Sequence, residues 1–156
     1  MYNTPTLTGY PSIDKPWLNY YSDEGKKLSV PEGSMFDHLY ACNSAFPDDI
    51  AIVFYGHNYT YANLFDQINK CCRNLTAIGI KKGDVVTVQA ISLPQVIIII
   101  YSLTRIGACG NMLYPDAKAE DIVHSMEKTG SRLLIVVDKL LSLYEIRHLK
   151  KICENF

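Results

Sequence analysis

The chain has 156 residues, a length that accommodates one globular unit with an appended segment. Apolar residues make up 48% and charged residues 20%, which excludes a disordered or low-complexity chain. The 15 Lys and Arg residues balance 16 Asp and Glu residues, so the formal net charge is -1 and nucleic acid is not expected as a partner.

The first segment, residues 1–33, contains four of the seven prolines and has neither helical nor strand periodicity. It is also rich in aromatic residues, among them Trp17, Tyr20 and Tyr21. These side chains would leave apolar area in water unless something covered them. We therefore expect an extended arm that lies along a surface.

A helix and a hairpin are predicted over residues 34–60. Ser34 is a suitable N-cap for a helix that runs to about Ala45. Ile50–Tyr55 has the composition of a strand, Gly56–Asn58 supplies turn residues, and a second short strand starts at Tyr59.

From residue 61 onward, helices and strands are predicted to alternate. The expected elements are a helix over 61–78 closed by Gly79, a strand over 85–90, a helix over 94–106, a strand over 108–114, a helix over 116–128 closed by Gly130, a strand over 133–137 and a last helix over 139–153. Strands that are continuous apolar runs separated by helices belong to a parallel sheet covered on both faces. The predicted fold class is α/β.

One of these assignments overrides local propensity. Val96–Ile100 is a run of β-branched residues, which favours a strand. Pro94 at the start and Gly107 at the end favour a helix instead, since proline suits the first helical position and glycine the residue after the last turn. We expect this run to be helical and largely buried.

The cysteines and the first residues of the chain predict the same cellular compartment, the cytoplasm. The five cysteines (Cys42, Cys71, Cys72, Cys109 and Cys153) have no C-x-x-C pair and no histidine at metal-ligand spacing, so we expect unpaired thiols. The start lacks the basic and apolar regions of a secretory leader. The longest apolar run, Val96–Leu103, is far below the ~20 residues that span a bilayer. A cytoplasmic location without a transmembrane segment is expected.

No active site emerges from the residues alone. The turn over 91–95 has no glycine, so the dinucleotide fingerprint is absent, as is a Walker phosphate loop. Ser92 is better explained as a helix cap than as an anion ligand. Asp116, Glu120 and Asp121 lie at a predicted helix N-terminus, where the helix dipole favours negative charge. The histidines (His38, His57, His124 and His148) are scattered, and each is expected on a wet surface.

Four stretches, taken in order, resemble a known family. They are Tyr59-Thr60-Tyr61-Ala62-Asn63-Leu64, Lys82-Gly83-Asp84-Val85-Val86, Leu103-Thr104-Arg105-Ile106-Gly107-Ala108 and Asn111-Met112-Leu113-Tyr114-Pro115. Over roughly residues 34–150 they look like the N-terminal core of the adenylate-forming enzymes, which include acyl-CoA synthetases, luciferases and peptide-synthetase adenylation domains. The last stretch looks more like acyl-CoA or coumarate-type ligases. Asn63 departs from the family's usual Glu or Asp, which weakens the helix start by some tenths of a kcal/mol.

The resemblance implies ATP-dependent activation of a carboxylate as an acyl-adenylate, then transfer to coenzyme A. It places the phosphate loop, the adenine clamp, the ribose-binding Asp and the catalytic Lys beyond Phe156. No catalytic, cofactor-binding or metal-binding residue is therefore assigned, and the chain alone is expected to be inactive. ATP, Mg and coenzyme A are implied for the full-length enzyme, and its downstream part is the implied partner.

Composition and the resemblance together predict three domains. These are an N-terminal arm over 1–33, a helix and hairpin over 34–60 that belong to a neighbouring subdomain, and a truncated first α/β subdomain over 61–156. The Ile50–Tyr61 hairpin would then be uncovered, and self-association through it is expected.

Two alternatives from other classes stay open. One is an α/β ligand-binding or interaction module without enzymatic activity, with a crevice near Ser92 and Asn111 at the carboxyl ends of its strands. The other is a small thiol protein, which the cysteine spacing disfavours.

Overall fold

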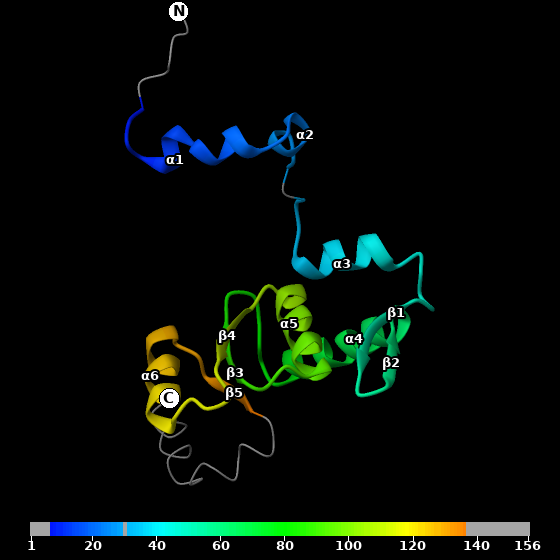
Figure 1. Cartoon of the computed structure of the whole chain (residues 1–156). Helices are drawn as coiled ribbons and strands as arrows, with labels where there is room; N and C mark the ends of the chain where they lie inside the picture. Colours follow the sequence, from blue (N-terminus) through cyan, green and yellow to red (C-terminus); the bar gives the residue numbers. More distant parts are fainter. Residues whose placement is uncertain (1–6, 30, 137–156) are drawn as a thin grey trace, which may run out of the picture. The chain divides into compact units, whose positions relative to one another are not determined.

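The computed structural model describes residues 7–29 and 31–136, which fall into two units, one up to Glu32 and one from Gly33 onward (Figure 1). Within the first unit, the prediction of an extended arm is wrong. The segment forms the short helix α1 (Pro11–Asp14), the 3-10 helix η1 (Pro16–Tyr20) and the short helix α2 (Asp23–Lys26). The first two begin at a proline, whose fixed φ is already set for a helical turn.

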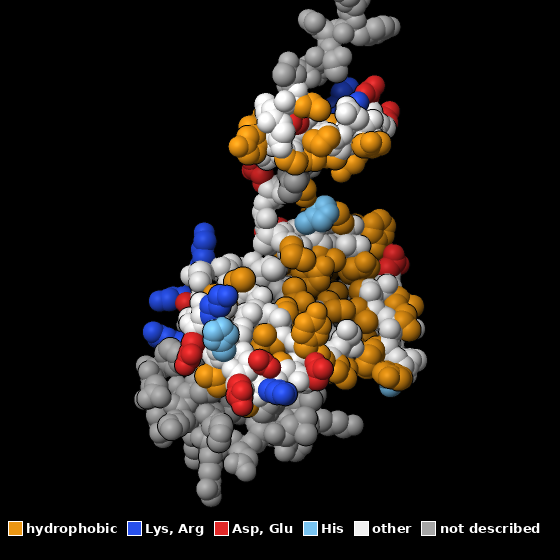
Figure 2. Space-filling model, turned by 60° about the vertical axis from the view of Figure 1, so that its left-hand side comes forward, with side chains coloured by type: hydrophobic (Ala, Val, Ile, Leu, Met, Phe, Trp, Pro, Cys, Tyr) orange, Lys and Arg blue, Asp and Glu red, His pale blue; other side chains and the backbone are white. Residues whose placement is uncertain are grey.

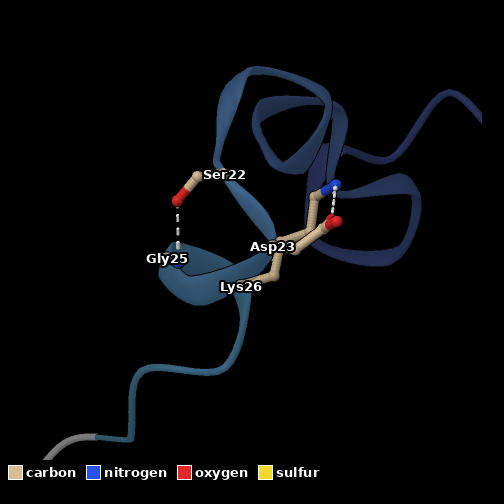
Figure 3. Close-up of polar contacts among 4 residues, drawn as sticks. All are labelled: Ser22, Asp23, Gly25 and Lys26. Atoms are coloured by element: carbon tan, nitrogen blue, oxygen red, sulfur yellow. Dashed lines mark hydrogen bonds and ion pairs between the residues drawn. The ribbon is translucent and has the colours of Figure 1, made fainter.

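Local hydrogen bonds hold the first unit together. The Asp14 carboxylate accepts bonds from the Thr8 amide (2.9 Å), the Thr8 hydroxyl (2.8 Å) and the Gly9 amide (2.9 Å). Figure 3 shows the Gly25 amide donating to Ser22 Oγ at 3.1 Å, and Lys26 paired with Asp23 at 3.3 Å. None of residues 7–29 is buried, so these residues form no hydrophobic core of their own.

The second unit opens with α3 (Met35–Asn43) and a hairpin of β1 (Ile50–Phe54) and β2 (His57–Thr60). Ser34 caps α3 as predicted, and its hydroxyl accepts from the Asp37 amide at 3.1 Å while Asp37 bonds back to the Ser34 amide. The turn is shorter than the predicted Gly56–Asn58, and β2 begins at His57, two residues before the predicted Tyr59. The turn consists of Tyr55 (φ 45°) and Gly56 (φ 80°), since a two-residue hairpin turn with both φ positive matches the twist of the strands.

The rest of the unit confirms the predicted α/β class. Its elements are α4 (Tyr61–Ala77), β3 (Val85–Gln89), α5 (Pro94–Ile106), β4 (Cys109–Leu113), α6 (Ala119–Thr129) and β5 (Leu133–Val136). The three strands form one parallel sheet in the order β4-β3-β5, with Val85 opposite Cys109 and Val86 opposite Leu133. The predicted helix over 139–153 lies outside the described residues.

Helices cover both faces of this sheet. On one face, Val86 and Val88 of β3 pack with Leu75 of α4 and Leu103 of α5. On the other, α6 packs Ile122 and Met126 against side chains of β4 and β5. A third cluster joins α3, the hairpin and α4 around four buried residues, Phe36, Leu64, Phe65 and Ile68.

Val96–Ile100 is helical, which confirms the override of local propensity, but its burial is only partial where we expected it to be largely buried. Ile97 is 36% exposed and the other residues of the run are only half-buried. The helix packs on α3, α4 and the sheet, which leaves part of its surface exposed. Figure 2 shows hydrophobic side chains gathered in a patch on one face of the second unit.

The start of α6 also differs from the prediction. The helix begins at Ala119 instead of Asp116, which lies in the preceding turn. Asp121 sets the boundary, because its carboxylate accepts from the amide of the N-cap residue Lys118 at 3.3 Å.

Candidate functional site

Two of the family-like stretches contact each other at the amino end of the sheet. The Gly83 amide donates to the Gly107 carbonyl (3.0 Å), and the Cys109 amide donates to the Asp84 carbonyl (2.8 Å). Gly107 ends α5 with φ +82°, and a Cβ added to it would lie 3.0 Å from Lys82 Cγ. The Lys82–Val86 and Leu103–Ala108 stretches therefore set the registration of β3 against β4.

Arg105, in the second of those stretches, ties three helices together. Its Nη1 donates to Asn69 Oδ1 of α4, and its guanidinium lies over the Phe36 ring of α3, 4.4 Å from the ring centroid. A cation over an aromatic face is stabilising, so this arginine also has a structural role.

The stretch over residues 59–64 forms the start of α4. The Thr60 hydroxyl accepts from the Asn63 amide at 3.3 Å. Within the described residues no reciprocal bond from the Asn63 side chain is recorded, in keeping with the weakened capping box expected of Asn at this position.

The carboxyl ends of β3 and β4 form the candidate binding site. The chain leaves β3 for α5 on one face of the sheet and leaves β4 for α6 on the other, so the two loops diverge (Figure 1). Ligands of open α/β sheets bind at such a point. An open hollow of about 680 Å³ lies there, lined by Ala90, Ile91, Ser92, Val96, Met112, Leu113, Tyr114 and Pro115.

The chemistry of this switch-point hollow is apolar. Ile91 is 51% exposed, Met112 45% and Tyr114 82%, and no charged side chain lines the hollow. Ser92 lies in the lining, but the N-cap of α5 is Leu93 and has no side-chain cap bond, so the expected capping role of Ser92 is wrong. The lining suits an uncharged apolar group better than a phosphate.

Asn111, expected beside Ser92, lies elsewhere. Its Nδ2 donates to Thr87 Oγ1 (3.2 Å) and to Ser125 Oγ of α6 (2.8 Å), within a polar network between the sheet and α6. Side chains alternate between the faces of a strand, which turns this residue away from the crevice.

Sequence reasoning missed Gln89, which bonds to the loop that contains the lining residue Pro115. It is fully buried, and its Nε2 donates to the carbonyls of Pro115 and Ala117, both at 3.1 Å. These bonds fix the loop between β4 and α6. A glutamine in an otherwise apolar central strand was the available signal, because a buried amide must find partners.

The predicted acidic cluster at α6 does not form a site. Asp116 lies before the helix, Glu120 and Asp121 lie in its first turn, and Asp121 closes the cap. The three described histidines are exposed, and His148 is outside the described residues. No group of three potential metal ligands occurs within residues 7–29 and 31–136.

The four cysteines in the described part of the chain are free. Cys71 and Cys72 are half-buried, as predicted for their place in a helix, and burial raises the pKa of the Cys71 thiol. Cys72 donates to the Ser102 carbonyl at 3.5 Å. Cys42 is exposed, with its Sγ 3.8 Å from His38 Nε2. Cys153 lies outside the described residues.

The chain matches a family model described as AMP-binding enzyme over residues 39–155, which is most of its length. The chain belongs to the AMP-binding enzyme family. It shares 26% identity over 125 residues with triostin synthetase I of Streptomyces triostinicus, covering 80% of this chain and 24% of that protein. With acetyl-coenzyme A synthetase 1 of Candida albicans it shares 28% identity over 130 residues, covering 75% of this chain and 19% of that protein.

Solved structures share this fold. An artificially fused adenylation-PCP di-domain, NpsA-ThdA from Klebsiella oxytoca, superposes with a TM-score of 0.66 at 25% identity, over 70% of this chain and 21% of that one. A mutant form of coronafacic acid ligase from Pectobacterium brasiliense gives a TM-score of 0.71 at 20% identity, over 78% and 24%. The chain spans about a fifth to a quarter of the length of these relatives.

No helix in the described part of the chain is both long and apolar enough to cross a membrane.

Proposed function

We propose that this chain is the N-terminal part of an ATP-dependent acyl-CoA synthetase. The full-length enzyme would join a carboxylate to the α-phosphate of ATP, releasing pyrophosphate, and coenzyme A thiolate would then displace AMP to give the thioester. The family match over residues 39–155 carries this proposal. The acetyl-coenzyme A synthetases among the relatives, and the Asn111–Pro115 stretch, support coenzyme A as the acceptor.

The residues that line the switch-point hollow do not form a site for the charged substrates of this reaction. The switch-point hollow has no charged lining, and no three potential metal ligands cluster within the described residues. The sequence has no glycine-rich phosphate loop. We therefore infer that this part of the enzyme has a scaffolding role.

Inactivity of the isolated chain tests this proposal. Catalysis of acyl and phosphoryl transfer depends on positioned charges, and no charged side chain lines the switch-point hollow. We expect no pyrophosphate exchange into ATP in the presence of acetate or longer carboxylates, and no micromolar binding of Mg-ATP by calorimetry. A full-length acetyl-coenzyme A synthetase serves as the positive control. A micromolar dissociation constant for Mg-ATP that is retained when Arg73, which lies outside the switch-point hollow, is changed to Gln would overturn the assignment.

A second candidate function is an α/β ligand-binding module, and the switch-point hollow is the observation that favours it. Such a module would bind an apolar ligand without ATP. Saturable perturbation of the Val96 and Leu113 methyl resonances by hexanol or benzyl alcohol, weakened by Met112→Ala, would favour this function. The control is Met35→Ala, which changes an exposed methionine on α3.

We further propose that the enzyme is located in the cytoplasm.

We also propose that the isolated chain associates with itself through the hairpin strand β1 and through exposed apolar side chains of α5. Val53 is 66% exposed on β1 and Ile97 is 36% exposed on α5. Exposed strand edges and apolar patches promote association. Light scattering should show a mass that rises with concentration and falls for Val53→Lys. A strictly monomeric wild-type chain at high concentration contradicts this expectation.

A further inference from the structure

A second hollow, of about 520 Å³, lies between α4 and α5, remote from the apolar lining of the first. Its lining residues are Asn69, Cys72, Arg73, Thr76, Ala77 and Arg105. This arginine hollow combines two guanidinium groups with an amide and a hydroxyl, all of which can donate hydrogen bonds.

Helix geometry brings the two arginines together. Arg73 follows Asn69 by four residues on α4, which places their Cβ atoms ~5–6 Å apart on the same face of the helix. Arg105 of α5 donates to Asn69 Oδ1. Arg73 and Arg105 therefore line the same hollow from neighbouring helices.

One of the two guanidinium groups is already fixed in place. The Arg105 guanidinium lies over the Phe36 ring and bonds to Asn69, and the rest of its N–H groups remain available. A donor held in one orientation loses less conformational entropy when it binds a ligand.

Neither arginine has an ion-pair partner among the described residues. The two ion pairs in that part of the chain are Lys26 with Asp23 and Lys70 with Asp66. Asp37, whose pKa is lowered in part by Arg105, directs its carboxylate to the amide and hydroxyl of Ser34. The positive charge in the hollow is thus left without a bonded counter-charge from within residues 7–29 and 31–136.

We propose that the arginine hollow binds a phosphate group of a small anionic ligand. A phosphate group carries about −1.5 to −2 charges at pH 7 and several acceptor oxygens, which matches two guanidinium groups and a hydroxyl. A carboxylate, with a single charge, would balance only one arginine. This inference is independent of the proposed enzymatic function, since it concerns a different face of the second unit.

The test uses the whole chain, labelled with ¹⁵N, at low ionic strength with inorganic pyrophosphate as the probe. We expect saturable shifts of the Arg73 and Arg105 Nε–H resonances and of the Asn69 side-chain amide. Arg73→Gln should weaken binding about three- to tenfold, as expected for loss of one charge-assisted contact near the surface. Arg73 is exposed and holds no described side chain in place, so this variant should fold.

Arg132→Gln is the matched control, because Arg132 is an exposed arginine that lines a different hollow. It should leave the affinity for pyrophosphate unchanged. The proposal is overturned if Arg73→Gln binds as wild type, if Arg132→Gln loses as much affinity, or if chloride at matched ionic strength produces the same shifts. Arg105→Lys keeps the charge but not the planar fork, and it should also weaken binding.

Discussion

The two units of this chain are stabilised in different ways. The first unit is held by bonds between residues close in sequence, such as Thr8 with Asp14 and Ser22 with Gly25, and none of its residues 7–29 is buried. The second unit buries three apolar clusters whose members come from distant elements. Local bonds suffice to shape short turns, whereas a parallel sheet requires long-range burial, so the two units should respond differently to substitution.

The largest expected effect follows from removing a core side chain of the second unit. Leu103 is 1% exposed between β3 and α4, and Leu103→Ala should lower the free energy of unfolding by about 2–5 kcal/mol. Ile13→Ala, at a 64% exposed position of the first unit, should change it by less than about 0.5 kcal/mol. Urea unfolding followed by circular dichroism measures both. Equal effects would contradict the difference between the units.

A smaller effect is expected from glycines with positive φ. Gly107→Ala imposes a strained backbone and places a Cβ 3.0 Å from Lys82 Cγ, so it should cost more than about 1 kcal/mol of stability. Gly9 has a similar φ of +80°, but nothing lies within 4 Å of an added Cβ. Gly9→Ala should leave urea unfolding of the second unit unchanged. A Gly107→Ala variant with the stability of the wild type would contradict this expectation and would show that the Lys82 side chain moves away from the added Cβ.

Low pH allows a comparison between two aspartates, one in each unit, whose carboxylates accept the same kind of hydrogen bond. Hydrogen bonds from Ser34 lower the pKa of Asp37, and bonds from Thr8 lower that of Asp14. Each contribution is present above the unfolded pKa near 3.8 and is lost as the pH falls through the lower folded value. Asp37→Asn should therefore flatten the acid limb of second-unit stability, whereas Asp14→Asn should alter only amide exchange around Thr8. NMR titration between pH 2 and 5 separates these outcomes.

The smallest expected effect is a gain in the stability of the second unit. Asn63→Glu would supply the carboxylate that can bond back to the Thr60 amide, which accords with the one-sided cap seen at α4. Stability should rise by some tenths of a kcal/mol, as is usual for an improved cap. Thermal unfolding compares it with Asn74→Glu on the exposed end of the same helix, where no cap forms. An equal gain at both positions would rule out capping as the cause.

The sequence alone determined most of the second unit. Periodicity, Pro94 and Gly107 predicted α5 against local propensity, because helix ends have specific chemical requirements that survive tertiary packing. The alternation of helices with apolar strands predicted the parallel sheet, and the order of four short stretches predicted the family. In the first unit the same reasoning failed, since turns of four or five residues are too short to show a period.

Only the tertiary structure decided what the side chains do. Ser92 and Asn111 are near each other in the predicted topology, yet one lines the crevice and the other bonds Thr87 and Ser125 beneath α6. Gln89 fixes a loop more than 25 residues away in sequence, and Arg105 reaches Asn69 across 36 positions. The pattern of one element gives its type and its apolar face, but the direction of a polar side chain depends on partners that folding brings from elsewhere.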